Sequence, residues 1–292
     1  MITRTSIVVA ALLASSTQAA NVYILSSDSA AIDNAVVSTL QALGHTATIG
    51  VPYYSFDGSQ SLAGFQAVYL QANSNWTSPN MPAAGQSQLL SFITAGGGLV
   101  TCEWTIWKAA AQSNFQIIAP SFAAQITVPY DSNPTAQFDA VTPDPAMNAG
   151  LPNSFTAPLD SYAGTETQFA PQAGATVFYH NPLNGYEAVV GRGYGSGRVL
   201  NFATTNGPSQ LADTNFARLF ANAFTWSTGG SCYANCDGST TAPVLNVLDF
   251  SCFLNRFASG AAYANCDGST TTPVLNVLDF SCFLNRFAAG CP

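Results

Sequence analysis

The sequence predicts an α/β domain with one large sheet and flanking helices, followed by a small all-α domain. Between residues 21 and 111, short apolar runs alternate with amphipathic helical segments, the pattern of a parallel sheet whose strands are joined by helices. Residues 233–262 and 263–292 are two copies of one unit that differ at four positions. A fixed internal period of this kind indicates two copies of one supersecondary unit packed together.

Length and composition define the broad class. The 292 residues suit one medium domain, assigned to residues 20–226, a linker at 227–231 and a small domain at 232–292. Apolar residues make up 48% of the chain, enough for a core, whereas charged residues make up only 8%. The net charge of −8 and the seven basic residues exclude a nucleic-acid partner, which requires a cationic face.

The first nineteen residues predict a signal peptide. Arg4 supplies the positive start, residues 7–14 the short apolar core, and Thr17-Gln18-Ala19 the small-residue cleavage site. The apolar run is too short to span a bilayer, and no later segment is long enough. We therefore expect an exported protein, extracellular or at the cell surface, without a membrane span.

In chain order, the first half alternates regularly. Apolar runs predict strands, and stripes at three- and four-residue steps predict helices, the first of which ends at Gly44. The expected strands are 22–25, 46–50, 65–70 and 98–102, and the expected helices are 32–43, 85–95 and 104–111.

The second half is less regular. A turn at 193–197 predicts a hairpin at the sheet edge, and residues 211–226 carry the apolar stripe of a final helix. The strands expected here are 125–128, 176–180, 187–191 and 198–204.

Each repeat begins with oxygen-bearing side chains at alternate positions and continues into an amphipathic helix, which is half an EF-hand. Calcium takes six to eight oxygen ligands, and such a loop supplies them from positions 1, 3, 5, 9 and 12, if an insertion within residues 240–243 is allowed for. The predicted ligands for two calcium ions, one per repeat, are Asn235, Asp237, Ser239, Asn246 and Asp249, and Asn265, Asp267, Ser269, Asn276 and Asp279.

Six of the seven cysteines lie in this tail, which predicts a disulfide framework in an exported segment. Cys232 and Cys291 have no counterpart in the repeat, so we expect them to pair with each other. The remaining four pair within repeats, as Cys236–Cys252 and Cys266–Cys282, or across repeats, because pseudo-symmetry allows both.

Residues 232–292 resemble the dockerin module, in particular the cysteine-bearing, planctomycete-type form of type I that ends in AAGCP. The resemblance implies a calcium-folded domain that binds a cohesin-like scaffold or surface protein. The loops depart from the usual pattern because Asn and Ser replace carboxylates at positions 1 and 5, and Thr-Thr-Ala-Pro replaces the usual glycine. Fewer charges weaken calcium affinity, so a disulfide-held helical hairpin without metal is the alternative.

Late in each helix lies one polar pair, Asn255–Arg256 and Asn285–Arg286. We interpret these pairs as a partner-binding face that is presented twice. The alternative is a solvated helix end, where a cation is favoured by the helix dipole.

Residues 21–228 resemble the class I glutamine-amidotransferase-like fold, especially its trehalose-utilisation-type relatives. The stretches that carry the resemblance are FITAGGGLV at 92–100, Pro143-Asp144-Pro145 with Gly150-Leu151, and GRGYGSGRVLNF at 191–202. The resemblance implies a flavodoxin-like sheet whose strand-to-helix elbow, at Cys102, holds a nucleophile.

The candidate catalytic residues are Cys102, Glu103 and His180. A cysteine nucleophile requires a base, but the family's histidine is missing near residues 204–206, and His45 and His180 are the chain's two histidines. Cys102 is alternatively a buried small apolar residue. Trp104, Trp107, Asp131 and His180 are candidates for lining a sugar pocket with Glu103, and the aromatic residues are alternatively core.

Three functions remain open at this stage. The first is an exported protein displayed on an extracellular assembly by its dockerin-like tail, with a non-catalytic or ligand-binding α/β domain. The second is a secreted hydrolase acting on polysaccharide. The third treats the tail as a sorting or surface-retention tag without a cohesin. The missing histidine and the complete repeat favour the first, with carbohydrate as a possible ligand.

Overall fold

The structure is a computed structural model, which describes residues 19–127, 130–229, 234–237, 239, 243, 245–267, 269 and 272–289. The expected signal peptide falls outside these residues except for Ala19. The expected Cys232–Cys291 disulfide also lies outside the described residues.

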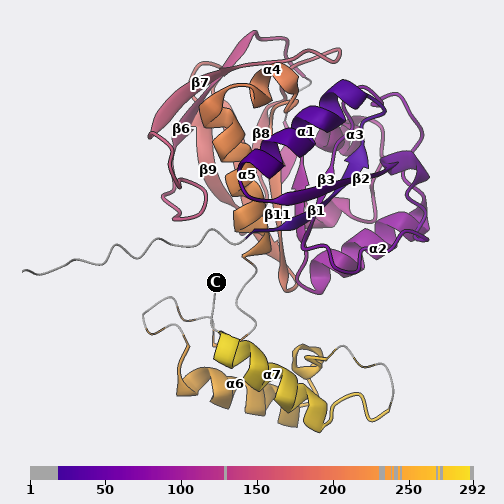
Figure 1. Ribbon diagram of the computed structural model, residues 1–292, viewed down its shortest axis with the longest axis vertical. Coiled ribbons are helices and arrows are strands. Elements are labelled where there is room, and N and C mark those ends of the chain that lie inside the picture. Colours follow the sequence, from indigo (N-terminus) through magenta and orange to yellow (C-terminus); the bar gives the residue numbers. More distant parts are fainter. Residues whose placement is uncertain are drawn as a thin grey trace, which may run out of the picture.

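One mixed sheet organises the α/β domain (Figure 1), and its strands run in the order β2-β1-β3-β4-β11-β10-β9-β6-β7. The first five are parallel, and the rest are antiparallel to their neighbours. The parallel half follows the 2-1-3-4-5 order of flavodoxin-like sheets, in which ligands bind beyond the carboxyl ends of the strands. The strands of the path are β2 (Thr46–Pro52), β1 (Asn21–Ser26), β3 (Ala67–Leu70), β4 (Gly98–Thr101), β11 (Gly197–Phe202), β10 (Tyr186–Tyr194), β9 (Thr176–Asn181), β6 (Thr135–Ala140) and β7 (Ser154–Pro158).

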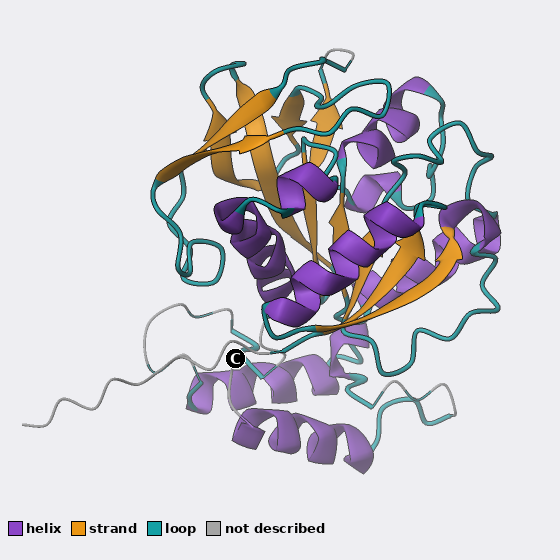
Figure 2. Ribbon diagram, turned by 45° about the horizontal axis from the view of Figure 1, so that its top comes forward, coloured by secondary structure: helices purple, strands orange, loops and turns teal. Residues whose placement is uncertain are grey.

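The parallel strands are buried on both faces because helices cover both. Successive residues of β1 alternate between two apolar cores: Val22 and Ile24 belong to one, Tyr23 and Leu25 to the other. The first core also contains residues of α1 (Ala30–Ala42) and α5 (Thr214–Thr228), and the second contains residues of α2 (Ala83–Thr94) and α3 (Glu103–Ala111). Figure 2 shows the sheet between these helices.

The first half of the domain confirms the predicted alternation of strands and helices, with boundaries shifted by at most two residues. The last helix differs, because it is divided into α4 (Pro208–Leu211) and α5. The Asp213 carboxylate accepts the backbone N–H groups of Asn215 and Phe216 at 3.0 and 2.9 Å, which caps a new helix. Helix α5 then continues to Thr228, two residues into the expected linker.

The prediction that the hairpin of β10 and β11 lies at the sheet edge is wrong. Strand β11 pairs with β4 in the middle of the sheet, and β10 is followed by three further strands. The expected strand at 125–128 is β5 (Ala124–Ile126), which pairs with β8 (Phe169–Pro171), outside the main path. Strands β6, β7 and β8 were not predicted. Strands β6 and β7 alternate polar and apolar residues, but most of their apolar positions are small alanines, and β8 is only three residues long.

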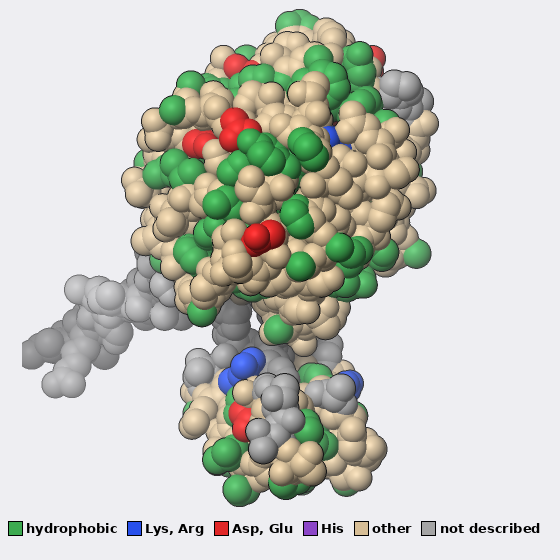
Figure 3. Space-filling model, turned by 90° about the vertical axis from the view of Figure 1, so that its right-hand side faces the viewer, with side chains coloured by type: hydrophobic (Ala, Val, Ile, Leu, Met, Phe, Trp, Pro, Cys, Tyr) green, Lys and Arg blue, Asp and Glu red, His purple; other side chains and the backbone are tan. Residues whose placement is uncertain are grey.

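Figure 3 shows one face of the molecule on which charged side chains are sparse. This fits the low charged content of the chain. Among the described residues, no helix is long and apolar enough to cross a membrane.

In the tail, helices α6 (Val247–Ala258) and α7 (Val277–Ala289) lie side by side (Figures 1 and 2). Phenylalanine side chains of the two helices pack against each other. The rings of Phe253 and Phe283 are stacked with centroids 4.2 Å apart, and both residues are completely buried. The disulfides Cys236–Cys252 and Cys266–Cys282 are present, so the pairing within repeats is confirmed. The repeated unit therefore buries its apolar stripe against its own second copy.

His45 connects the beginning of the domain to its last helix. The backbone N–H of Ala20 donates to Nδ1 at 3.1 Å, so Nε2 carries the proton and donates to the carbonyl oxygen of Ala221 at 3.1 Å. Burial lowers the pKa of His45 below its usual value, although the hydrogen bond to Ala221 raises it. If Nδ1 were protonated, its N–H would face the backbone N–H of Ala20, and the hydrogen bond between them would be lost.

We expect acid to destabilise the domain through His45. Because the pKa is lower in the folded than in the unfolded state, the unfolded state binds more protons just below pH 6.5, and stability falls as the pH falls through this window. Thermal unfolding of the wild type and of His45→Gln between pH 7.5 and 5 measures the effect. The difference in Tm between the two proteins should narrow on acidification, and a constant difference would refute this role.

Candidate functional site

Polar residues gather where β1, β3, β4 and β11 end at their carboxyl edge. Cys102 follows β4 and precedes α3, as predicted for the elbow, and is completely buried. Its thiol donates to Asn73 Oδ1 at 3.1 Å and lies 3.7 Å from the hydroxyl of Thr105. Burial raises the pKa of the Cys102 thiol, so the neutral, weakly nucleophilic form is favoured.

Glu103 is the first residue of α3, and its side chain is enclosed on all sides. Its backbone N–H donates to the carbonyl oxygen of Thr204 at 3.0 Å, which fixes it beside the end of β11. The carboxyl group has no exposed surface, and neither of its oxygens has a hydrogen-bond partner. Burial and the nearby charges of Glu166 and Asp131 raise the pKa of Glu103 well above its usual range. Its surroundings therefore favour the protonated form of this carboxyl.

Glu166 is a second buried carboxyl on an adjacent segment. Its backbone bridges Thr204 on one side and Asp131 on the other, so the segments of the three acids lie next to one another. Side-chain amides of Asn133, Asn181 and Asn184 donate to its carboxylate. Burial raises the pKa of Glu166 to about 7, and the charge of Asp131 adds to this, whereas the amides oppose it.

An aromatic cluster surrounds Trp104, which lies in the first turn of α3. The cluster consists of Trp76, Trp104, Trp107 and Tyr130. Trp104 stands at its centre, with ring centroids 5.1 Å from Trp76, 4.7 Å from Trp107 and 5.2 Å from Tyr130. The Trp104 indole Nε1 is buried without a hydrogen-bond partner, and Tyr130 is 41% exposed. The cluster therefore extends from the buried acids to the surface.

Lys108 holds the Trp76 loop in place. Its ammonium group is buried on α3 and donates to the carbonyl oxygens of Trp76 and Ser78 at 2.7 and 3.0 Å. A third bond goes to the Gln112 side chain at 2.9 Å. The position of Trp76 relative to Trp104 is thus fixed from the same helix.

His180, the third predicted catalytic residue, does not join Cys102 and Glu103. It lies on β9, where its Nδ1 contacts the Glu187 carboxylate at 3.2 Å. The next residue, Asn181, reaches Glu166 at 3.4 Å, and because neighbouring side chains of a strand point to opposite faces, His180 points away from that site. The residues at the elbow thus have neither of the chain's two histidines as a base.

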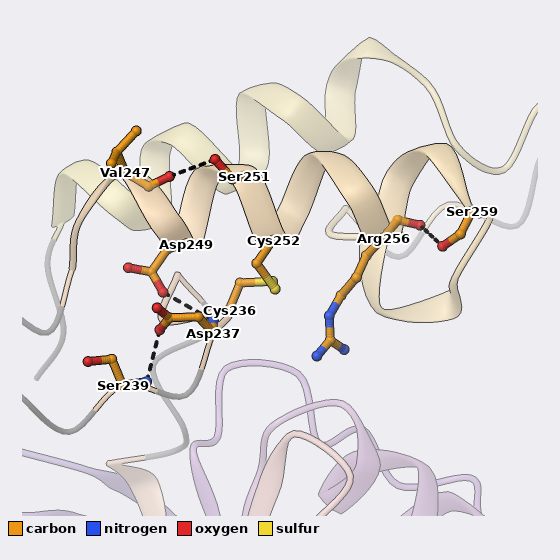
Figure 4. Close-up of a disulfide and its surroundings, with 9 residues drawn as sticks. All are labelled: Cys236, Asp237, Ser239, Val247, Asp249, Ser251, Cys252, Arg256 and Ser259. Carbon is orange, nitrogen blue, oxygen red and sulfur yellow. Dashed lines mark hydrogen bonds between the residues drawn. A yellow bond between two sulfur atoms is a disulfide. The ribbon is translucent and has the colours of Figure 1, made fainter.

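The two tail loops arrange their oxygens identically. Asp249 is buried, and its carboxylate accepts the backbone N–H groups of Asn246 and Asp237 at 2.8 and 3.2 Å. Figure 4 shows Asp237 and Asp249 close together, with Ser239 next to Asp237. In the second loop, Asp279 makes the same bonds to Asn276 and Asp267.

One ligand position in each loop fits a metal especially well. The side-chain oxygens of Asn235 and Asn265 are buried and have no hydrogen-bond partner. By contrast, the oxygens of Asn246 and Asn276 cap the helices, accepting the N–H groups of Leu248 and Leu278 at 2.8 Å. Within the described part of the chain, no group of three or more His, Cys, Asp or Glu side chains is arranged to hold a metal, because each loop has only two carboxylates. A hard cation here would depend on amide and backbone oxygens.

The predicted partner-binding residues lie on exposed helix surface. Asn255 and Asn285 are exposed, as are Arg256 and Arg286. The Arg256 guanidinium lies over the Tyr263 ring, 4.4 Å from its centroid. Arg256 is therefore held in place by the segment that joins the repeats.

A cavity of about 630 Å³ lies elsewhere, at the Pro143-Asp144-Pro145 motif. Two of its polar side chains are already engaged: Asp144 accepts the N–H groups of Ala146 and Met147, and Asn148 donates to Tyr179. We therefore place the candidate site at Glu103 and not in this cavity.

Sequence reasoning identified Glu103, Trp104, Trp107 and Asp131 but missed Glu166. Glu166 follows no apolar run and belongs to no motif, and its partners Asn133, Asn181 and Asn184 are up to 33 residues away. The sequence does not show that these three asparagines surround Glu166, because only the pairing of strands brings their segments together.

We expect removal of the Glu103 carboxyl to stabilise the protein. Glu103→Leu retains the volume and abolishes a buried acid without partners, which should raise the free energy of unfolding by about 1–3 kcal/mol. Urea unfolding at pH 7 measures this. Glu187→Gln, which only breaks the half-exposed pair with His180, is the control and should change stability by less than about 1 kcal/mol. Destabilisation by Glu103→Leu would mean that the carboxyl has an internal partner.

No family model matches the chain, and no curated protein matches it. Solved structures nevertheless share its fold. A cytoplasmic protein from Salmonella typhimurium superposes with a TM-score of 0.54 at 12% identity, over 71% of this chain and 98% of its own. Another cytoplasmic protein from Salmonella typhimurium LT2 gives 0.54 at 14% identity, over 71% and 98%.

A ThuA-like protein from Bacteroides uniformis gives a TM-score of 0.50 at 15% identity, over 72% of this chain and 91% of its own. Identities this low are informative about fold alone, and all three similarities leave over a quarter of this chain uncovered. The α/β domain of this chain therefore has the class I amidotransferase-like fold of ThuA-like, trehalose-utilisation-type proteins.

Proposed function

We propose that this protein is exported and attached to an extracellular or cell-surface assembly by a calcium-binding, dockerin-like tail. Its α/β domain is the part displayed there, as a ligand-binding domain. One observation carries the proposal. Asn235 and Asn265, at the same position of two nearly identical loops, each bury a side-chain amide oxygen that has no hydrogen-bond partner. Buried acceptors without partners are rare in folded proteins, and a cation supplies what they lack.

Calcium would be held by Asn235, Asp237 and Asp249 in the first loop and by Asn265, Asp267 and Asp279 in the second. Ser239 and Ser269 follow at the positions expected for further oxygens. When bound, the ion supplies positive charge that compensates the two carboxylates of each loop. The chain's own contribution is to preorganise them, since backbone amides already orient Asp249 and Asp279 and disulfides connect each loop to its helix.

The partner face we propose contains exposed apolar residues next to the predicted polar pairs. Leu248 and Asn255 are seven residues apart and therefore lie on one side of α6, as do Leu278 and Asn285 on α7. Leu248 is 60% exposed and Leu278 59%. Exposed leucines at equivalent positions of both copies suit a cohesin-like partner that either copy can contact.

Calcium should bind the full chain and stabilise its tail. At a calcium concentration of one hundred times Kd, binding to the folded state alone adds about 2.7 kcal/mol. Isothermal titration should show two sites, and Asp249→Asn combined with Asp279→Asn should remove the heat. Asp57→Asn, an exposed change in the α/β domain, should leave it unchanged. Absence of heat at millimolar calcium would contradict the metal site.

Partner binding should be lost only when both copies are altered. Leu248→Lys or Leu278→Lys alone should weaken binding to a cohesin-like domain less than about threefold, and the double variant at least about tenfold, because either copy can serve. Surface plasmon resonance with and without EDTA measures this. Binding that is independent of calcium, or unaffected in the double variant, would contradict the proposed face. Absence of binding by the wild type would favour the retention-tag alternative.

A hydrolase acting on polysaccharide is the second candidate. The specific observation is the pair Glu103 and Glu166. Burial raises the pKa of Glu103 well above its usual range and that of Glu166 to about 7, and two carboxyls in different surroundings can take acid and base roles. The neutral, buried Cys102 without a histidine argues against a cysteine nucleophile. Assays of glycan hydrolysis by the wild type and Glu103→Gln decide between a catalytic and a binding domain.

A further inference from the structure

Two consecutive residues at the start of α3 bury polar atoms that nothing in the protein satisfies. Both carboxyl oxygens of Glu103 and the indole Nε1 of Trp104 have no hydrogen-bond partner, and both side chains have no exposed surface. A single buried polar atom without a hydrogen-bond partner has many explanations. Here two consecutive residues bury an unpaired donor and unpaired acceptors at the carboxyl edge of a doubly wound sheet, where ligands bind, and this points to a missing molecule.

The chemistry of these atoms restricts what that molecule is. The indole N–H can only donate, so it needs an acceptor. The Glu103 carboxyl, protonated or not, accepts through oxygen and in its acid form also donates. An ammonium group offers donors only and would leave Trp104 unpaired. A hydroxyl group both donates and accepts, so a molecule with several hydroxyls can pair with each of the two side chains.

The surroundings favour a molecule with several hydroxyls and an apolar face. Trp76, Trp107 and Tyr130 pack around Trp104, and Lys108 fixes the loop that carries Trp76. Flat aromatic rings stack on the C–H faces of sugar rings, burying apolar surface without demanding charge. Glu166 and Asp131 provide further acceptors on the neighbouring segments.

We infer that Glu103, Trp104 and Tyr130 belong to a binding site for a neutral carbohydrate, with Glu166 as its second carboxyl. The ligand enters beside Tyr130, the outermost ring of the cluster, which packs on Gly164: a Cβ at Gly164 would lie 2.7 Å from the Tyr130 ring. The inference specifies the ligand of the α/β domain within the proposed function and is independent of the tail.

Tryptophan fluorescence of the full chain tests the site directly, because three of the four tryptophans belong to the cluster. The probes are cello-, xylo-, manno- and chito-hexaose, with tetramethylammonium chloride as the cationic comparison. We expect a saturable change with at least one saccharide and none with the cation. Glu103→Leu should weaken that saccharide at least about tenfold, the effect of losing one buried hydrogen bond, and Glu187→Gln should leave its affinity unchanged.

A response to the cation alone, no response to any saccharide, or unchanged affinity in Glu103→Leu would overturn the inference. If Glu103→Leu does not fold, Tyr130→Ala replaces it: this residue is exposed, and the loss of stacking should weaken binding about tenfold. Unchanged affinity in Tyr130→Ala would then overturn the site. Calcium heats recorded on the same wild-type sample report on the tail separately, so failure of either proposal is distinguishable.

Discussion

The parallel pairing of β4 with β11 is the contact on which the rest of the α/β domain depends. It joins residues 98–101 to residues 198–201, one hundred positions apart. Helices pack closely where this pairing begins: a Cβ at Gly197 would lie 2.2 Å from the carbonyl oxygen of Ile93 in α2, and one at Gly98 would lie 2.7 Å from Ser227 in α5. Only glycine fits at these two positions. Asn201 adds a buried bond to Thr101 at 2.6 Å and accepts the N–H groups of Ala123 and Ala124.

This pairing also creates the candidate site. Because β11 lies directly beside β4, the chain that leaves β11 at Thr204 accepts the N–H of Glu103 and pairs on its other side with Glu166. Residues from three distant parts of the sequence thus meet at the carboxyl edge of the sheet. The antiparallel strands beyond β11 help to position Glu166, because Asn181 on β9 donates a hydrogen bond to its carboxylate.

The sequence predicted the elements whose signal is local and missed those whose signal is not. Apolar runs of four to six residues identified β1, β3 and β4, which are buried on both faces. Strands β6 and β7 were missed although both alternate polar and apolar residues, because most of their apolar positions are small alanines and their signal is weak. On the polar face, Gln137 and Asp139 bond each other and Ser154. In the site, Glu103 was named because it follows a clear strand, whereas Glu166 depends on pairing between segments. His180 was grouped with the site by residue type alone, and strand alternation directs it elsewhere.

The elbow after β4 explains why the fold does not determine the chemistry here. Cys102 packs with the core on the side of α1 and α5, and its thiol is engaged by Asn73. Helix α3 then directs Trp104 to the other side, where it belongs to the second core. In a fold whose elbow residue is expected to be the nucleophile, the unsatisfied groups belong instead to the two residues that follow it. Burying them costs stability with no return within the chain. The proposed carbohydrate would supply the missing partners here, as the proposed calcium would for the unpaired amide oxygens of the tail.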